Sequence, residues 1–326
     1  MVRFEDIAAA RERIGDSLSA TPLIADHVLS EHLQRRVLLK TELLQPTGSF
    51  KPRGVLNWIR TASADELAAG LGAVSAGNHA RALAWAAEDA GIPVTVVMPE
   101  NASPAKVAAT REHDADVILH GDINGAWKLM RRLVDERGLT LVHPYDDPRI
   151  IAGQGTIGLE ILEQAPDTST IICPIGGGGL LSGIALAARA LRPDLCLIGV
   201  EPEGAASMRH AWNHGGPTRL LNVDTCAWSL GAAIVGEHTY RICRAFVDNL
   251  MTVSEEGIRS ALRHLLADCK LFAEPGAATA MAALREEALP KLPHAGDIVV
   301  VITGGNMGWD ELQRMIRPHA LHQDTR

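Results

Sequence analysis

The chain has 326 residues, of which 47% are hydrophobic and 21% charged, and its formal net charge is −8 at pH 7. This composition excludes a largely disordered chain and provides enough apolar material for about two domains. Because the chain is acidic and has no long run of like charges, it lacks the features of a nucleic-acid-binding or membrane-surface protein. We therefore expect a small-molecule partner, with no nucleic acid and no membrane as partners.

The location of the protein is predicted from its N-terminus and its cysteines. The first residues contain no apolar signal core, and no apolar stretch approaches the roughly 20 residues that a bilayer requires. The five cysteines are widely spaced and form no C-x-x-C pair, which argues against a disulfide framework or a zinc site. These features predict a cytoplasmic protein with free thiols.

Short apolar runs alternate with helix-patterned segments along the chain, which is typical of an α/β fold with a mainly parallel sheet. The clearest helices are expected at 79–90, 180–191 and 254–266. Eight strands are many for one open sheet in a chain of this length, so we expect two sheets in two intertwined domains. The expected strands are 37–39, 71–74, 94–98, 117–120, 139–142, 170–173, 195–200 and 298–302.

The first loop of interest is Thr47–Gly54, which contains Lys51 and Pro52. Proline suits the start of a helix, so Lys51 is expected at a helix N-terminus, where the dipole disfavours an ammonium and lowers the lysine pKa. A lysine so placed can act as a nucleophilic amine. The alternative is an ordinary solvated charge in a loop.

The second loop, Ser75–His79, follows the expected strand 71–74 directly. Its small residues, free amides and side-chain amide suit a substrate carboxylate at a helix N-terminus. The alternative interpretation is simple helix capping by Ser75 or Asn78.

Two glycine-rich segments follow. Gly153–Gly158 matches G-x-G-x-x-G, but it does not directly follow a strand, so we interpret it as the backbone at the entry to a helix. Gly176, Gly177, Gly178 and Gly179 do lie between a strand and a helix. Their amides can converge on a phosphate; the alternative is a tight turn with close helix packing.

The last loop, Thr303–Asn306, follows the most hydrophobic strand and offers a hydroxyl beside two glycines, which would let a planar ligand approach the backbone. The alternative is an ordinary turn at the end of a strand. Ligands of open α/β sheets bind at the carboxyl ends of strands, where all four loops are expected. Together they provide an amine, two anion sites and a hydroxyl. This set fits one phosphorylated aldehyde cofactor better than a nucleotide, and no P-loop motif is present.

These motifs, together with Val200-Glu201-Pro202, resemble the threonine dehydratase and serine racemase branch of the fold-type II pyridoxal phosphate enzymes. The resemblance runs in order from Thr21 to Asn306. It implies a tryptophan synthase beta-like α/β fold, with a small domain, 47–147, inserted into a large cofactor-binding domain, 1–46 plus 148–326. It also implies pyridoxal 5'-phosphate as the cofactor and a homodimer or higher homo-oligomer.

The resemblance also implies roles for individual residues. Lys51 would form the Schiff base and act as the catalytic base, and Phe50 would pack against the pyridine ring. Gly176, Gly177, Gly178 and Gly179 would hold the phosphate, Asn78 the ring hydroxyl and Thr303 the ring nitrogen. Ser75, Gly77, Asn78 and His79 would bind the substrate carboxylate.

The implied activity is a dehydratase of the ammonia-lyase type, which converts a threonine-like or serine-like β-hydroxy amino acid into a 2-oxo acid. Ala76 stands where serine racemases carry an acid–base serine, so we expect dehydration without efficient racemisation. The family's cation site falls near Glu201, Ala205 and Ser207, a poor set of ligands, so no metal is expected.

Other activities stay open at this point. Within the same fold, a β-replacement synthase or an amino-acid racemase is the alternative. From a different class, the glycine loops also allow a nicotinamide-dependent oxidoreductase. The segment Cys226–Gly231 departs from the usual Asp-Gly pattern of threonine dehydratases, so a bulkier β-hydroxy amino acid is a further candidate substrate.

Overall fold

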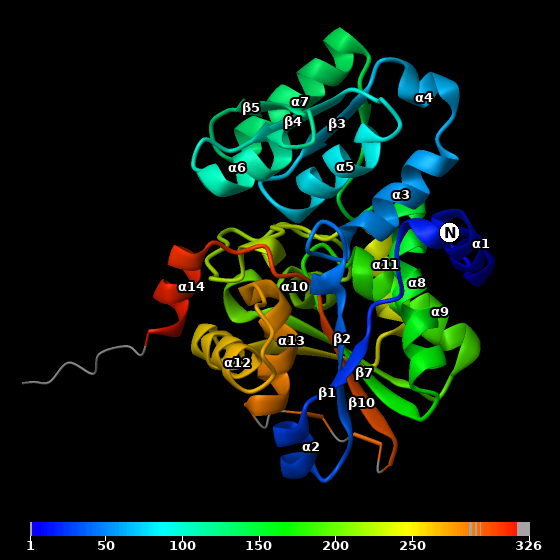
Figure 1. The fold of residues 1–326 in the computed structure, drawn as a ribbon, viewed down its shortest axis with the longest axis vertical. Coiled ribbons are helices and arrows are strands. Elements are labelled where there is room, and N and C mark those ends of the chain that lie inside the picture. Colours follow the sequence, from blue (N-terminus) through cyan, green and yellow to red (C-terminus); the bar gives the residue numbers. More distant parts are fainter. Residues whose placement is uncertain (1, 287–288, 291, 294, 318–326) are drawn as a thin grey trace, which may run out of the picture.

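The computed structural model describes residues 2–286, 289–290, 292–293 and 295–317, and it contains two stacked α/β units (Figure 1). The larger sheet has six strands in the order β1-β2-β10-β7-β8-β9, and only the β1–β2 pair is antiparallel. The smaller sheet has four parallel strands in the order β5-β4-β3-β6. The α/β class with two mainly parallel sheets is therefore confirmed.

The strand bounds follow the two sheets. The larger sheet consists of β1 (Leu23–Ala25), β2 (Val37–Thr41), β10 (Asp297–Ile302), β7 (Thr168–Pro174), β8 (Cys196–Pro202) and β9 (Asn249–Val253). The smaller sheet consists of β5 (Asp116–Leu119), β4 (Val94–Met98), β3 (Leu71–Val74) and β6 (Thr140–Leu141). Every expected strand is present, but β1 and β9 were missed because these edge strands are short or interrupted by polar residues.

The helices pack on the faces of both sheets. Helices α5, α6 and α7 surround the smaller sheet, whereas α12 and α13 lie on the opposite side of the larger sheet from α8 and α9 (Figure 1). The helix bounds are α1 (Phe4–Ile14), α2 (His27–Leu33), α3 (Lys51–Thr61), α4 (Ala64–Ala68), α5 (Asn78–Glu88), α6 (Pro104–Arg111), α7 (Ile123–Arg137), α8 (Pro148–Gln164), α9 (Gly179–Leu191), α10 (Ser207–His214), α11 (Glu237–Phe246), α12 (Glu255–Ala267), α13 (Pro275–Arg285) and α14 (Trp309–Ile316).

The positions of the strands can be compared with the expected domain boundaries. The strands of the smaller sheet lie between residues 71 and 142, and those of the larger sheet lie before residue 42 or after residue 167. Helix α3 contacts both α5 and α8, so it touches both units. The division into 47–147 and 1–46 plus 148–326 stays a prediction.

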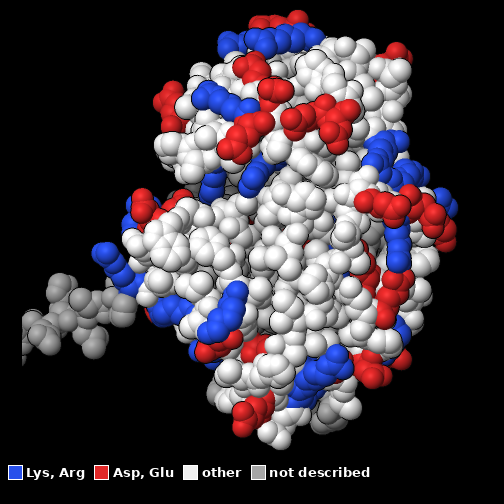
Figure 2. Space-filling view, viewed as in Figure 1, with Lys and Arg blue, Asp and Glu red and all other residues white. Residues whose placement is uncertain are grey.

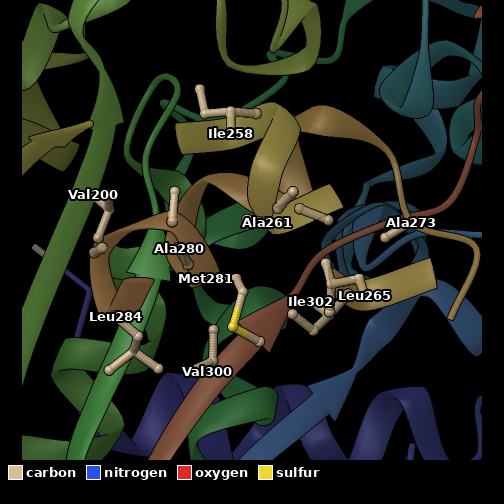
Figure 3. Packing of buried hydrophobic residues seen from close by; sticks show 14 of the residues in the cluster. Val200, Ile258, Ala261, Leu265, Ala273, Ala280, Met281, Leu284, Val300 and Ile302 are labelled. Carbon is tan, nitrogen blue, oxygen red and sulfur yellow. The ribbon is translucent and has the colours of Figure 1, made fainter. Parts of the chain in front are cut away.

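Helix α13 is buried along nearly its whole length. Its Ala280, Met281 and Leu284 pack against Val300 and other residues of the larger sheet (Figure 3). The many alanines of α13 let the helix approach the sheet closely, as in a tightly packed core. This packing holds the N-terminal end of α13 beside the loop that follows β10.

The prediction for Gly153–Gly158 was wrong in position, because these glycines lie inside α8 rather than at its entry. A Cβ on Gly153 would stand 2.4 Å from the carbonyl oxygen of Arg53 in α3. A Cβ on Gly155 would stand 2.9 Å from the carbonyl oxygen of Gly183 in α9. The glycines therefore allow α8 to pack closely against two neighbouring helices.

The surface carries charges of both signs. On the face shown in Figure 2, acidic and basic side chains are interspersed over both units. Within the described part of the chain, no helix combines the length and the apolar character that spanning a bilayer needs.

Candidate active site

Lys51 is the first residue of α3, as its position before Pro52 predicts. Its Nζ donates a hydrogen bond of 2.8 Å to the carbonyl oxygen of Pro144 and lies 5.0 Å from the centre of the Phe50 ring. Burial lowers the pKa of Lys51 to about 8, against an opposing effect of the Glu274 carboxylate. The lowered pKa agrees with the sequence argument, but its main cause is burial rather than the helix dipole.

The glycine loop joins β7 to α9. The amides of Gly176 to Gly179 donate no hydrogen bond to any other described residue, although three of these glycines are buried. Buried backbone donors are nearly always paired in native proteins, so this row of amides is suited to an anion. Gly178 has a φ of +93°, which side-chain-bearing residues rarely adopt.

Close packing explains the remaining glycines of the loop. A Cβ on Gly177 would lie 2.2 Å from Cγ of Tyr145, and one on Gly179 would lie 2.8 Å from the Tyr145 carbonyl oxygen. Glycine is therefore needed in this loop for close packing, and its backbone amides are also available to bind an anion. The two interpretations of the sequence are compatible, because backbone packed this tightly still leaves its amides free.

Tyr145 lies between Pro144, which binds Lys51, and the glycine loop, which packs against its ring. This residue was not identified from the sequence. It follows Pro144, the hydrogen-bond partner of Lys51, and its hydroxyl donates to the carbonyl oxygen of Ile234 at 2.8 Å. The available signal was its place just after the strand expected at 139–142. In the smaller sheet that strand pairs in parallel with β3, which the loop Ser75–His79 follows.

The loop Ser75–His79 enters α5, but neither Ser75 nor Asn78 is the N-cap. The N-cap is Gly77, whose amide donates to Ser75 Oγ at 3.2 Å. The amides of Asn78 and His79 find no acceptor among the described residues. These free amides at a helix N-terminus suit a carboxylate, which supports the predicted role of the loop.

The ring of His79 plays a different part from its amide. Its Nε2 donates to the carbonyl oxygen of Val142 at 2.9 Å, and its buried Nδ1 has no partner among the described residues. Burial lowers the pKa of His79 to about 3, so the imidazole is neutral. A bare Nδ1 accepts hydrogen bonds only, so any contribution of His79 to carboxylate binding comes from its backbone.

The loop after β10 lies against the Lys51 loop. The amide of Phe50 donates to the carbonyl oxygen of Thr303 at 3.1 Å, and Ser49 pairs with Gly304 in an isolated bridge. A Cβ on Gly304 would lie 3.1 Å from Cβ of Ser49 and 3.3 Å from Nδ2 of Asn78. Three of the loops singled out in the sequence therefore meet at Gly304.

Glu274, which sequence reasoning also missed, lies beside this meeting point. Its side chain is 5% exposed, and its Oε1 accepts a hydrogen bond of 2.8 Å from Nδ2 of Asn78. Burial raises the pKa of the Glu274 carboxyl group, against the opposing effects of Ser229, Lys106 and Asn78. The only signal in the sequence was an acidic residue directly before Pro275, at the start of an otherwise apolar helix.

A cavity of about 220 Å³ lies between the two units. Its lining includes Asn78, Arg81, Lys106, Asn306, Met307 and Glu311. The Lys106 ammonium lies 5.5 Å from the centre of the Trp228 ring, which connects the two units beside the cavity.

The residues considered for a cation are otherwise engaged. The two carboxylate oxygens of Glu201 accept the amides of Met208 at 2.7 Å and Arg209 at 2.9 Å. Ser207 Oγ is buried without a partner among the described residues. Glu201 therefore accepts hydrogen bonds from the amides at the start of α10. The absence of a metal near Ala205 stays a prediction.

A second group of potential ligands lies elsewhere. Asp26, His264 and Cys269 bring one ligand atom each within 4.8 Å of one another. His264 Nε2 already lies 2.7 Å from Asp26 Oδ2, and its Nδ1 lies 2.8 Å from Asp268. We assign this cluster the structural role of joining α2 to α12.

The site fits a group that carries both an anion and a reactive carbonyl. Free amides are available in the glycine loop, and a lysine with a lowered pKa binds the carbonyl oxygen of Pro144, next to Tyr145 in the chain. Ser49 Oγ is buried without a hydrogen-bond partner in the described part of the chain, next to Gly304 and Asn78. These unused polar groups meet the needs of the expected cofactor.

Comparisons with known proteins agree with this arrangement. A family model described as "Pyridoxal-phosphate dependent enzyme" matches residues 14–304. An L-threonine ammonia-lyase of Thermotoga maritima is 39% identical over 318 residues, covering 97% of this chain and 78% of that protein. A phenylserine dehydratase of Ralstonia pickettii is 41% identical over 278 residues, covering 85% of each chain. The solved structure of maize serine racemase has a TM-score of 0.92 and 32% identity, covering 96% of each chain.

Proposed function

Because the chain belongs to the threonine dehydratase and serine racemase branch of the pyridoxal-phosphate-dependent enzymes, we propose that it removes water and then ammonia from a β-hydroxy amino acid. The product is a 2-oxo acid. Its cofactor is pyridoxal 5'-phosphate, and its substrate is an amino acid. The observation that carries the proposal is the partly buried Lys51, whose lowered pKa suits a base and whose partner Pro144 is followed by Tyr145, which contacts the glycine loop with its free amides.

We assign the cofactor contacts as follows. The amides of the glycine loop 176–179 would hold the phosphate, and Lys51 Nζ would hold the cofactor covalently. Phe50 would lie against the ring, while Asn78 and Thr303 would bind its hydroxyl and its nitrogen. The unpartnered amides, the contact between Phe50 and Thr303, and the nearness of Asn78 to Gly304 support this assignment.

The mechanism draws on general acid–base catalysis. Bound pyridoxal phosphate supplies an electron sink for the substrate Cα. The amides of Asn78 and His79 would orient the substrate carboxylate. The substrate amine would take the place of Lys51 Nζ on the cofactor, and the freed lysine amine would then take the Cα proton as general base. In the cofactor-free site, burial already lowers the pKa of Lys51 to about 8, which favours the neutral amine relative to an ordinary lysine. The β-hydroxyl would leave as water with a proton that the Lys51 ammonium can return, and hydrolysis of the released enamine would give the 2-oxo acid and ammonia.

The substrate is proposed to be threonine, serine or a larger β-hydroxy amino acid. The relatives named above act, by their names, on L-threonine and on phenylserine. Ala76 has a methyl group where an acid–base serine is expected in a racemase, so elimination is favoured over racemisation. We further infer a cytoplasmic location and a homodimer or higher homo-oligomer. Similarity to the ammonia-lyase over 97% of this chain disfavours the nicotinamide-dependent alternative.

The proposal is tested with Lys51→Ala and the matched control Lys128→Ala, in which an exposed lysine of α7 is removed. Ammonia release is measured with L-serine, L-threonine and phenylserine, alongside the visible absorbance of the bound cofactor. We expect Lys51→Ala to lose both signals and Lys128→Ala to keep both. Turnover retained by Lys51→Ala, or no ammonia from any substrate with the unaltered protein, would contradict the proposal.

A further inference from the structure

We propose that Glu274 is a positioning residue of this site, which fixes the side-chain amide of Asn78 together with Asn306. In the resulting orientation, Asn78 turns its nitrogen rather than its oxygen toward Gly304. This inference rests on the proposed function, in which Asn78 contacts the cofactor.

Both ends of the Asn78 amide are held by hydrogen bonds. Its Nδ2 donates to Glu274 Oε1 at 2.8 Å, and its Oδ1 accepts from Nδ2 of Asn306 at 2.7 Å. An amide group is nearly symmetric in shape, so only its partners determine which end is the donor. A carboxylate accepts hydrogen bonds only, and Nδ2 of Asn306 donates only. The two partners together therefore permit a single orientation.

This orientation leaves one donor of Asn78 unused. An amide nitrogen carries two protons, and one of them is bonded to Glu274. The nitrogen lies close to Gly304, where a Cβ would stand 3.3 Å away, and Gly304 pairs with Ser49 in the Lys51 loop. The second N–H of Asn78 is therefore available beside the loops that meet around Lys51.

Asn306 is held in turn by its own partners. Its Nδ2 also donates to the carbonyl oxygen of Thr47 at 2.7 Å, and its Oδ1 accepts from Arg81 at 3.0 Å. Arg81 and Asn78 belong to α5, whereas Asn306 and Glu274 lie beside the larger sheet. The same hydrogen bonds therefore connect the two units beside the cavity, which Asn78, Arg81 and Asn306 line.

The Glu274 side chain does not cap the helix that it precedes. Glu274 is the N-cap of α13, but its carboxylate makes no capping hydrogen bond to the helix. Serine, threonine, asparagine or aspartate would cap better there. The carboxylate is instead buried against Asn78 of the other unit, at the cost of desolvation. Its hydrogen bond to Asn78 links it to the site, whereas its carboxylate does not cap α13.

The test measures the dissociation constant of pyridoxal phosphate by absorbance titration, together with the unfolding temperature of the cofactor-free protein. The variants are Glu274→Ala, Glu274→Gln and Asn78→Ala, each alone, and the double variant Glu274→Ala/Asn78→Ala. Glu286→Ala is the matched control, because Glu286 follows the other end of α13 and binds Ser254. That control is expected to lower the unfolding temperature without changing the dissociation constant.

We expect Glu274→Ala to raise the dissociation constant roughly tenfold, as for the loss of one hydrogen bond to a charged group. Glu274→Gln keeps an acceptor oxygen for Asn78 and should stay within about threefold of the unaltered protein. If Glu274 acts through Asn78, Glu274→Ala should have almost no further effect in the Asn78→Ala background.

Equal effects of Glu274→Ala in both backgrounds, or no effect in either, would overturn the positioning role. If the unaltered protein bound no pyridoxal phosphate, the proposed function itself would fail instead. A protein that binds the cofactor and releases ammonia, but tolerates Glu274→Ala, would refute only this inference.

Discussion

Substituting Gly177 by alanine should destabilise the protein through one identifiable contact, the ring of Tyr145. The added Cβ would stand 2.2 Å from Cγ and 2.3 Å from Cδ1 of that ring, far inside van der Waals contact. Gly177 does not have a positive φ, so backbone strain is not the cause. The ring must move, and its hydroxyl would then lose the hydrogen bond to Ile234.

The size of the effect follows from the packing. Forcing one extra carbon into a close-packed site costs about 1 to 3 kcal/mol of unfolding free energy. Tyr145→Ala alone should cost about 3 kcal/mol, by analogy with other truncations of large aromatic residues. In the double variant the added methyl group occupies space that the ring has vacated. The double variant should therefore be about 2 kcal/mol more stable than the sum of the single effects predicts.

The assay is urea unfolding of the cofactor-free protein, followed by circular dichroism and by tryptophan fluorescence. Coincident transitions are needed before free energies are compared. Gly178→Ala is the control, because its cost comes from the φ of +93° and from Met208 and Thr239. The losses of unfolding free energy caused by Gly178→Ala and by Tyr145→Ala should therefore simply add in the double variant. If the effect of Gly177→Ala is the same with and without the Tyr145 ring, the steric explanation is wrong.

Three further predictions concern charge and chirality. Burial lowers the pKa of Lys51 from 10.5 to about 8, so its charge destabilises the folded state below pH 8 and this penalty disappears toward pH 10.5. The stability of the cofactor-free protein relative to Lys51→Met, from urea unfolding at several pH values, should therefore rise by up to about 3 kcal/mol across that range; a flat difference would contradict the shift. Arg53 is buried and donates to Glu42 and Glu160, so Arg53→Met should lower the unfolding free energy by about 3 to 5 kcal/mol. An unchanged urea midpoint would show that these carboxylates find other partners. Chiral chromatography of recovered substrate should show no D/L exchange with the unaltered protein and measurable exchange with Ala76→Ser; rapid exchange without the substitution would refute the role given to Ala76.

Much of the fold could be predicted from local pattern. Apolar runs such as 71–74 and 94–98 are long enough to be recognised as buried parallel strands, and their bounds agree with those of β3 and β4. Helix α12 begins where its N-cap serine predicts. The edge strands β1 and β9 were missed, because an edge strand needs less apolar character than a central one.

The candidate site was predictable where a short motif carries its own chemistry. Lys51 beside Pro52 and the four consecutive glycines stand out because each is unusual for ordinary loops. The rule that parallel strands end at one edge of a sheet brings such loops together without any coordinates. Membership of the enzyme family agrees with that reasoning and names the cofactor.

Other parts of the site depend on contacts between distant positions. Asn78 meets Glu274 across 196 residues and Asn306 across 228, and no local pattern predicts either pair. The tertiary structure also decided that burial lowers the Lys51 pKa, and that Tyr145 lies over Gly177. The physical reason is that periodicity and turn chemistry act over a few neighbouring residues. Desolvation and hydrogen-bond geometry are set by whichever side chains the folded chain brings within a few ångströms.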